Sequence, residues 1–443
     1  MKRVANILIS FIFAFALCFG YALPANAAID GSDYIGSTTV TERGLTITEA
    51  PSSACEEGIL CTSDGTVLWS RNANEKHAMA SVTKMMTALV VLESGVDINS
   101  TTKISANAAS VGESTSELMA GYVVTIYDLL CGLLVHSGND AGIALAEATY
   151  GDVDSFVEKM NEKAKELGLT NTHFTNPHGL DDDNHYSTAY DLCVLQRYCM
   201  TNSTFAEIVG KKKVTVSYSG KKKTFRSTNS LMNSWKACKG TKTGYTNNAG
   251  YCLASTAVQD DIQLYCVVLG CSDESERFTD SYKLLEWGFN HYRKTLFAKA
   301  GETLVDVPLS AYLDKTVAAG IKEDYYGTIL DYDGNVSAEI SLKDISGGIS
   351  KGSDVGTITF KQGDSIVGSV TLVALETKLP PLAITTIWTS AVRLIGCVTG
   401  DDAIADSVVY IQEIEVTRND DLSGEEVQES MEKSIRKDAT RNG

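Results

Sequence analysis

The sequence has little positive charge for its length. Its 443 residues carry 38 Lys+Arg against 56 Asp+Glu, which gives a formal net charge of −18. A protein whose main task is to grip nucleic-acid phosphates needs a dense basic surface, so no nucleic acid is expected as a partner. The hydrophobic content of 44% is ordinary for a globular protein and excludes a fully disordered chain.

Common metal-binding and disulfide patterns are also missing. The six His and eleven Cys residues form neither an H-E-x-x-H segment nor paired C-x-x-C segments. Several cysteines, such as Cys131 and Cys266, stand in apolar runs, where we interpret them as small buried hydrophobes. His173, His178 and His185 alternate with acidic residues, so a zinc peptidase stays as an alternative. We expect no metal and no cofactor.

The N-terminus has the features of an export signal. Lys2 and Arg3 precede a continuous apolar run over 7–23, and small residues follow up to Ala27. This order is typical of a secretory signal peptide, so residues 1–27 are predicted to be removed and the mature protein to act outside the cytosol. A membrane anchor is the alternative interpretation of the same run.

Two folded regions are expected after a linker at 28–50. Residues 51–297 mix β-rich runs with helix-length apolar runs, which favours an α/β domain with helices against an antiparallel sheet. Residues 298–378 show short alternating stretches punctuated by Gly, which predicts a small all-β domain. Helices are predicted over 81–93, 125–135, 140–150, 153–167 and 280–292, with Thr125 and Asp140 as N-caps and Gly168 as a stop.

An amphipathic segment follows at 380–398. On a helical wheel, one face collects Ile384, Ile387, Trp388, Ala391, Val392, Leu394, Ile395 and Val398. The segment is too short to span a bilayer, so it is predicted to lie in a membrane interface, with packing on the protein's own surface as the alternative. Residues 399–443 are acidic and are expected to form a solvated, largely disordered tail.

One serine and one lysine stand at the start of the most apolar predicted helix. Ser81 and Lys84 are three residues apart and so share a helix face, where an unprotonated lysine can activate the serine hydroxyl as a nucleophile. The pattern S-x-x-K alone is weak evidence, because it also begins at Ser100, Ser219, Ser430 and Ser434.

Two further motifs follow in order. Ser137-Gly138-Asn139 falls in a turn between two apolar helices and supplies a hydroxyl and an amide. Lys242-Thr243-Gly244 precedes a β-rich run. Serine with lysine, serine with asparagine, and lysine-threonine-glycine form the motif set of penicillin-binding proteins and serine β-lactamases.

The sequence resembles the low-molecular-mass penicillin-binding proteins that act as D-alanyl-D-alanine carboxypeptidases. The likeness extends beyond the three motifs to Ala80–Ala88, Asn176–Leu180, Tyr186–Ala189, Gly250–Leu253 and Arg277-Phe278. It implies the serine β-lactamase and penicillin-binding transpeptidase-like fold, with the small β domain behind it. It also implies an exported enzyme at the outer face of the bacterial cytoplasmic membrane or in the cell wall.

The resemblance implies a role for each motif residue on a peptidoglycan stem peptide ending in D-Ala-D-Ala. Ser81 would form the acyl-enzyme, Lys84 would be its base, Ser137 would relay a proton to the leaving amine, and Asn139 would position Lys84 and substrate. Lys242, Thr243, Gly244, Tyr245 and Arg277 would bind the substrate, with backbone N–H groups of Ser81 and Tyr245 as the oxyanion hole. β-Lactam antibiotics would be covalent inhibitors.

Several alternatives remain open. A class A β-lactamase needs a glutamate to activate the deacylating water, and residues 176–187 contain Asp181, Asp182 and Asp183 but no glutamate. Penicillin is therefore expected to inhibit the protein. A non-catalytic wall-binding or penicillin-sensing protein, a β-lactamase and an endopeptidase of the same fold are the other candidates.

Two lysine triplets flank a predicted hairpin turn near Ser219-Gly220. Lys211–Lys213 and Lys221–Lys223 are interpreted as a solvated hairpin tip, with a basic strip for anionic wall polymers as the alternative.

Overall fold

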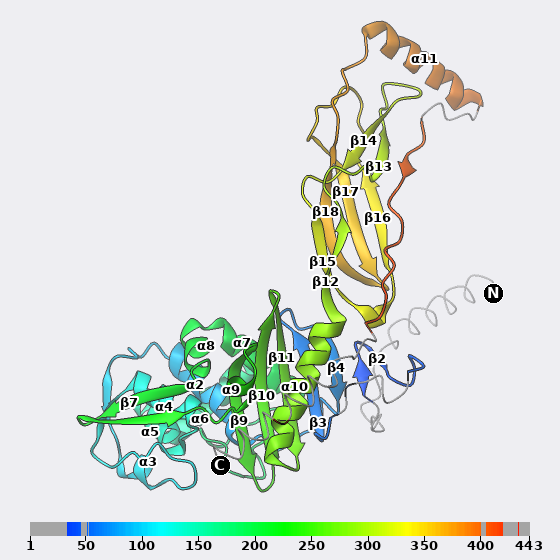
Figure 1. Cartoon of the computed structure of the whole chain (residues 1–443). Coiled ribbons are helices and arrows are strands. Elements are labelled where there is room, and N and C mark those ends of the chain that lie inside the picture. The colour runs from blue at the N-terminus through cyan, green and yellow to red at the C-terminus, as the bar shows by residue number, and fades with distance from the viewer. Residues whose placement is uncertain (1–32, 46–50, 52, 400–404, 420–432, 434–443) are drawn as a thin grey trace, which may run out of the picture.

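The structure is a computed structural model that describes residues 33–45, 51, 53–399, 405–419 and 433. The predicted signal peptide at 1–27 lies outside the described residues. Figure 1 shows a mixed α/β body with an elongated β body standing at an angle to it and helix α11 at the far end of the β body.

The centre of the first body is a seven-stranded antiparallel sheet in the order β2-β1-β4-β3-β11-β10-β9. Its strands are β1 (Tyr34–Ile35), β2 (Thr38–Thr39), β3 (Glu57–Thr62), β4 (Val67–Arg71), β9 (Cys238–Thr246), β10 (Gly250–Gln259) and β11 (Ile262–Cys271). Short turns join β3 to β4 and β10 to β11.

Helices cover both faces of this sheet because its central strands are apolar on both sides. In β11, Tyr265, Val267 and Leu269 belong to one core cluster and Leu264, Cys266 and Val268 to the other. Among the described residues, only α10 supplies a long helix to the second cluster. The helices are η2 (Ala80–Thr83), α2 (Lys84–Glu93), α3 (Ala106–Ser110), α4 (Ile126–Val135), α5 (Asn139–Tyr150), α6 (Val153–Glu166), α7 (Ala189–Thr201), α8 (Ser203–Val209), α9 (Leu231–Ser234) and α10 (Glu274–His291).

The local signals place most helix ends correctly. Thr125 caps α4 by accepting from the Asp128 backbone N–H, and Gly168 follows the end of α6 with φ +73°. The prediction for Asp140 is wrong, because Gly138 is the N-cap of α5 and the Asp140 carboxylate instead accepts from the backbone of Ser116. Helix α10 begins earlier than predicted, at a capping box formed by Asp273 and Glu276.

Residues 33–45 are not a linker, as had been expected of 28–50. Strands β1 and β2 extend the central sheet, and Ile35 is fully buried in the core. Arg43 ties this segment to the start of the β body, since its guanidinium donates to the carbonyl of Tyr332 and pairs with Asp333. The Thr-, Ser- and Gly-rich composition suggested a linker. Strands β1 and β2 have two residues each, which is too short to show the alternation of apolar and polar residues that identifies a strand.

A second, four-stranded sheet lies at the other end of the first body, in the order β5-β6-β7-β8. Its strands are β5 (Thr101–Lys103), β6 (Val123–Thr125), β7 (Lys213–Tyr218) and β8 (Lys221–Arg226). Inward-facing Val214, Val216, Tyr218 and Phe225 are buried. The β7–β8 hairpin therefore has one covered face and one open face.

The β body holds a two-stranded sheet, β12-β15, and a six-stranded sheet, β16-β17-β18-β14-β13-β19. Its elements are β12 (Tyr292–Ala298), β13 (Val305–Pro308), β14 (Thr316–Gly320), β15 (Tyr325–Leu330), η3 (Asp331–Asp333), β16 (Val336–Leu342), β17 (Asp354–Gln362), β18 (Ser365–Ala374) and β19 (Val408–Val409). The predicted domain boundary at 297/298 falls inside β12. A separate apolar cluster around Phe297, Ile358 and Phe360 forms the core of this body.

Helix α11 (Ala383–Thr399) presents its apolar face outward. Ile384, Ile387, Trp388 and Leu394 are each at least 66% exposed, whereas Thr389 on the polar face is 4% exposed. Packing of the apolar face on the protein's own surface, the alternative in the sequence analysis, is therefore wrong for these four side chains. No helix in the described part of the chain is long and apolar enough to cross a membrane.

Part of the predicted disordered tail is ordered. Strand β19 pairs with β13, and Ile414 forms a β-bridge with Val336. Short apolar stretches within an acidic composition add an edge strand here, although the net charge suggested a solvated tail. Most of the tail, 400–404, 420–432 and 434–443, lies outside the described residues.

Candidate active site

Ser81 lies on a tight turn between the central sheet and the helices. It belongs to the 3₁₀ turn η2, in which residues i and i+3 eclipse, so its hydroxyl stands directly over Lys84, the first residue of α2. The preceding residue, Ala80, has φ +47°, a conformation that is costly for a residue with a side chain. Close packing on both sides of Ala80 holds this turn in place.

Two glycines make that packing possible. A Cβ on Gly179 would lie 1.9 Å from the Ala80 carbonyl oxygen, and one on Gly244 would lie 3.1 Å from the backbone nitrogen of Ser81. The loop at 176–180 therefore approaches the Ser81 turn more closely than a residue with a side chain allows, and at Gly244 of strand β9 a side chain would fit only if its neighbours shifted. This explains the glycine of the Lys-Thr-Gly motif.

Lys84 is fully buried and has three polar neighbours. Its Nζ atom lies 2.6 Å from Ser81 Oγ, 2.7 Å from Asn139 Oδ1 and 2.6 Å from the carbonyl oxygen of His178. The amide and carbonyl oxygens only accept hydrogen bonds. A neutral amine has two N–H groups for these two acceptors and one lone pair, which is left to face the Ser81 hydroxyl.

The electrostatics of the site favour that neutral form. Burial, and after it the neighbouring Lys242 cation, lower the pKa of Lys84 well below its ordinary value of 10.5. Burial and the Arg277 cation lower the pKa of Lys242 to about 7. Burial is the larger of the two causes for Lys84.

Ser137 and Asn139 flank a second strained turn. Ser137 has φ +72°, and Gly138 lies so close to Ser116 that an added Cβ would meet the Ser116 hydroxyl at 2.2 Å. Asn139 begins α5 and is 2% exposed; its Nδ2 donates to the carbonyl of Gly112. The Asn139 amide is thereby oriented with its oxygen toward Lys84.

Strand β9 brings the third motif to the same place. Lys242 Nζ lies 2.9 Å from Ser137 Oγ, which places the third motif beside the second. The Thr243 hydroxyl lies 2.6 Å from that of Thr228, a residue that no sequence signal marked. Tyr245 follows on the strand with 48% of its surface exposed and its ring against Tyr251.

Arg277 lies behind β9 and is only 5% exposed. Its guanidinium donates to the Gly244 carbonyl at 3.0 Å and pairs with Glu274 at 2.7 Å. Through these contacts Arg277 supports the backbone of the Lys-Thr-Gly strand. Its contact with substrate stays a prediction.

The loop after α6 uses its histidines and acids structurally. His185 Nδ1 accepts from the backbone of Thr175, and its Nε2 lies 2.7 Å from the Thr83 hydroxyl, so both ring nitrogens are occupied. Asp181 accepts from the Thr246 hydroxyl and so fastens this loop to the β9–β10 turn. His178 contributes its carbonyl to Lys84, a role of the main chain that side-chain motifs do not reveal.

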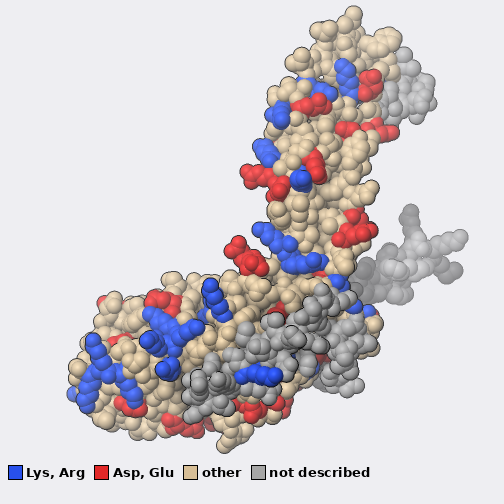
Figure 2. All heavy atoms as spheres, viewed as in Figure 1, with Lys and Arg blue, Asp and Glu red and all other residues tan. Residues whose placement is uncertain are grey.

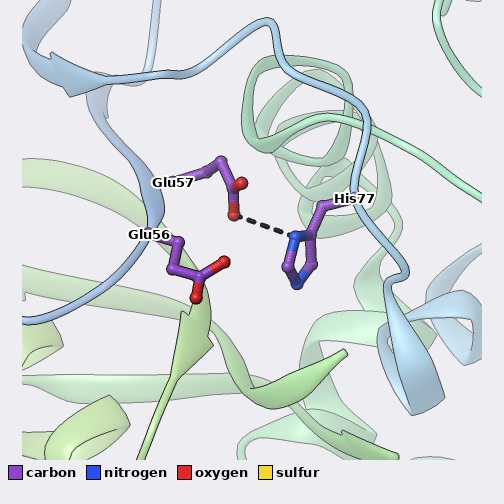
Figure 3. A group of neighbouring side chains, drawn as sticks. All are labelled: Glu56, Glu57 and His77. Carbon is purple, nitrogen blue, oxygen red and sulfur yellow. Dashed lines mark ion pairs between the residues drawn. The ribbon is translucent and has the colours of Figure 1, made fainter. Parts of the chain in front are cut away.

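A separate acidic group lies beside the segment that leads to Ser81. Figure 3 shows Glu56, Glu57 and His77, whose ligand-type atoms all lie within 4.8 Å of one another. His77 Nδ1 lies 3.2 Å from Glu57 and its Nε2 lies 3.0 Å from the Ala249 carbonyl, so both nitrogens face acceptors. Burial alone would lower the pKa of His77, but these bonds outweigh it and raise the pKa above 6.5. The group is best described as an ion pair that ties β3 to the β9–β10 turn.

Comparison with known proteins agrees with this geometry. Residues 46–273 match the family described as D-alanyl-D-alanine carboxypeptidase, and residues 292–378 match the C-terminal domain of penicillin-binding protein 5. The chain belongs to the D-alanyl-D-alanine carboxypeptidase family. The expected fold class is confirmed as well, since solved structures of this family share it.

Members of the carboxypeptidase family cover most of the chain. It is 34% identical to the D-alanyl-D-alanine carboxypeptidase DacF of Bacillus subtilis, over 70% of this chain and 82% of the relative. It is 34% identical to DacC of Escherichia coli, over 74% and 85%. The structure of penicillin-binding protein 5 from Haemophilus influenzae superposes with a TM-score of 0.57 at 29% identity, covering 74% of this chain and 98% of that one.

Proposed function

We propose that this protein is a serine-type D-alanyl-D-alanine carboxypeptidase that removes the terminal D-Ala from peptidoglycan stem peptides. The single observation that carries the proposal is the buried lysine at hydrogen-bonding distance from a partly exposed serine, Lys84 with Ser81. Family membership supplies the substrate class, and β-lactams act as covalent inhibitors by entering the same reaction.

Acylation begins with transfer of the Ser81 proton. The lone pair of Lys84 Nζ takes the hydroxyl proton as Ser81 Oγ attacks the carbonyl carbon between the two D-alanines. Asn139 and the His178 carbonyl hold Lys84 for this step. The proton then passes through Ser137, which bonds Lys242, to the nitrogen of the leaving D-Ala.

The oxyanion and the terminal carboxylate are bound from strand β9. We assign the backbone N–H groups of Ser81 and Tyr245 to the oxyanion; the close approach of Gly244 to the Ser81 nitrogen supports this. Lys242 and Thr243 are the residues proposed to receive the substrate carboxylate, and Arg277 is retained as a more distant contributor. Water then hydrolyses the acyl-enzyme and releases the shortened peptide.

The proposed activity predicts release of D-alanine from a peptide ending in D-Ala-D-Ala. Benzylpenicillin should abolish the release because it acylates the same serine, and a metal chelator should leave it unchanged. D-Alanine is measured after incubation with each agent. Loss of cleavage with the chelator but not with penicillin would make the protein a metallopeptidase.

We further propose that the protein is exported and held at the outer face of the cytoplasmic membrane. The signal peptide at 1–27 and the outward apolar face of α11 support this location. An exposed face of this kind gains free energy by burial in the acyl boundary of a bilayer. The family's substrate lies in the same compartment.

Three charges on the apolar face of α11 should prevent membrane binding. Replacing Ile384, Ile387 and Leu394 by Glu removes apolar area worth several kcal/mol of transfer free energy, so binding to vesicles should fall more than about tenfold. Thr386→Glu with Ser390→Glu, on the exposed polar side, is the matched control. These variants keep β19, which truncation before Pro380 would remove. Unchanged vesicle binding of the triple variant would exclude α11 as the anchor.

A further inference from the structure

The positive charge of this acidic protein is concentrated in one stretch. Residues 208–259 contain no Asp or Glu, although the chain as a whole has a net charge of −18. The cations of this stretch are Lys211, Lys212, Lys213, Lys221, Lys222, Lys223, Arg226, Lys236, Lys239 and Lys242. Figure 2 shows Lys and Arg side chains gathered at the end of the molecule where Figure 1 places β7.

The open face of the β7–β8 hairpin carries only cations and hydroxyls. In the antiparallel register, Lys213 lies opposite Arg226 and Ser217 lies opposite Lys222. These four side chains therefore lie on one face of the hairpin. All of them are exposed, as are Thr215 and Thr224, whose hydroxyls are 2.8 Å apart. We name the residues 213, 215, 217, 222, 224 and 226 the hairpin face.

The cations of the hairpin face differ from two neighbouring lysines that have carboxylate partners. Lys211 pairs with Glu207 and Lys223 pairs with Glu117. Within the part of the chain that the structure describes, no carboxylate forms an ion pair with Lys213, Lys222 or Arg226. Like charges directly opposite each other, as at Lys213 and Arg226, destabilise a hairpin. Strand β8 is an edge of this sheet, but Lys213 lies on β7, which is paired on both sides, so blocking an exposed edge does not account for Lys213.

The hairpin face is joined to the active site and is remote from α11. Two residues beyond β8, Thr228 bonds the Thr243 hydroxyl, and Phe225 stacks on His136, the residue before Ser137. Figure 1 places α11 at the opposite end of the molecule. If α11 lies on the membrane, the hairpin face lies at the end of the molecule that is far from the lipid surface.

We propose that the hairpin face binds an anionic polymer with repeating phosphate groups, carried by the wall that also holds the substrate. Lys, Arg and Ser or Thr hydroxyls are the groups that contact phosphates without reading any further chemistry. Binding there places the active site beside the polymer and holds it near the stem peptides. The proposal concerns a surface outside the catalytic group and goes beyond the proposed activity.

The test measures binding of the full chain to poly(glycerol phosphate). Three phosphate contacts predict a salt dependence with a slope of about −2, which is about a 15-fold loss of affinity between about 50 and 200 mM salt. The variant Lys213→Gln/Lys222→Gln/Arg226→Gln should show a nearly flat salt dependence. At about 50 mM salt its affinity should be at least about 15-fold below that of the wild type. The matched control Lys299→Gln/Lys315→Gln/Lys322→Gln removes the same charge from exposed positions of the β body and should bind as the wild type does.

Four further measurements test the proposal. Release of D-Ala from a short peptide should be unchanged in the hairpin variant, which shows that the fold and the catalytic group are intact, and Lys222→Gln alone should weaken binding in the same direction. Equal binding by the hairpin and control variants would overturn the proposal. So would stronger binding to polyglutamate than to the phosphate polymer, or a hairpin-dependent binding to anionic lipid vesicles, which would make the surface a membrane contact.

Discussion

Lys84→Met is expected to lower the acylation rate about 100- to 10,000-fold, the usual contribution of a general base. The methionine side chain fills the buried space of Lys84 but offers no lone pair to the Ser81 proton. Acylation is measured by stopped-flow reaction with a chromogenic cephalosporin. The central claim about Lys84 fails if acylation by the variant stays within about threefold of the wild type.

The chain supplies a matched control for Lys84. Ser100 and Lys103 repeat the S-x-x-K pattern, but Lys103 is exposed on β5 and the Ser100 hydroxyl donates to the Asp97 carbonyl. Lys103→Met should acylate at the wild-type rate. Lys84→Arg should be as impaired as Lys84→Met, because a guanidinium does not lose its proton in proteins. Comparison of Lys84→Arg with Lys84→Met distinguishes loss of the base from loss of a positive side chain, because only the Arg variant keeps the positive charge.

Lys242→Gln is expected to act in two ways. It removes the proposed partner of the substrate carboxylate, which should lower kcat/KM about 10- to 100-fold, since hydrogen bonds to charged groups contribute about 1.5–3 kcal/mol. It also removes the cation that helps to lower the pKa of Lys84. The pKa of Lys84 should therefore rise, and the acid limb of the pH–rate profile should move to higher pH.

The pH dependence separates these two effects. Lys242→Arg keeps a cation at every pH and should leave the acid limb near its wild-type position. In the wild type, Lys242 loses its proton as the pH rises through about 7, so an alkaline fall in kcat/KM is expected that the Arg variant does not show. Measurement of kcat/KM from acid to alkaline pH checks both limbs. An acid limb that does not move in Lys242→Gln would show that its charge does not act on Lys84.

Much of the candidate site was accessible from the sequence, because short motifs contain the side chains that the structure brings together. Lys84 bonds Ser81 and Asn139, and Lys242 bonds Ser137, two residues before Asn139, so the three motifs lie together as their order had indicated. Ser81 and Lys84 lie side by side, as their spacing of three residues predicts. Ser81 is in a 3₁₀ turn and not in an α-helix, but residues i and i+3 are neighbours in both.

The contributions of the main chain and of distant segments were not accessible. The His178 carbonyl that accepts from Lys84 belongs to a loop whose side chains gave no signal for it. Thr228 reaches Thr243 only through the fold of the β7–β8 hairpin. Strands β1 and β19 were missed because two-residue strands show no periodicity; their pairing is decided by the strands they meet.

The most direct test of Ser81 as the nucleophile is the mass of the protein after incubation with benzylpenicillin. We expect one covalent adduct per chain, carried by the peptide that contains Ser81. The adduct should be absent in Ser81→Ala and retained in Ser100→Ala. Labelling of another serine, or an adduct that persists in Ser81→Ala, would contradict the assignment of Ser81 as the nucleophile.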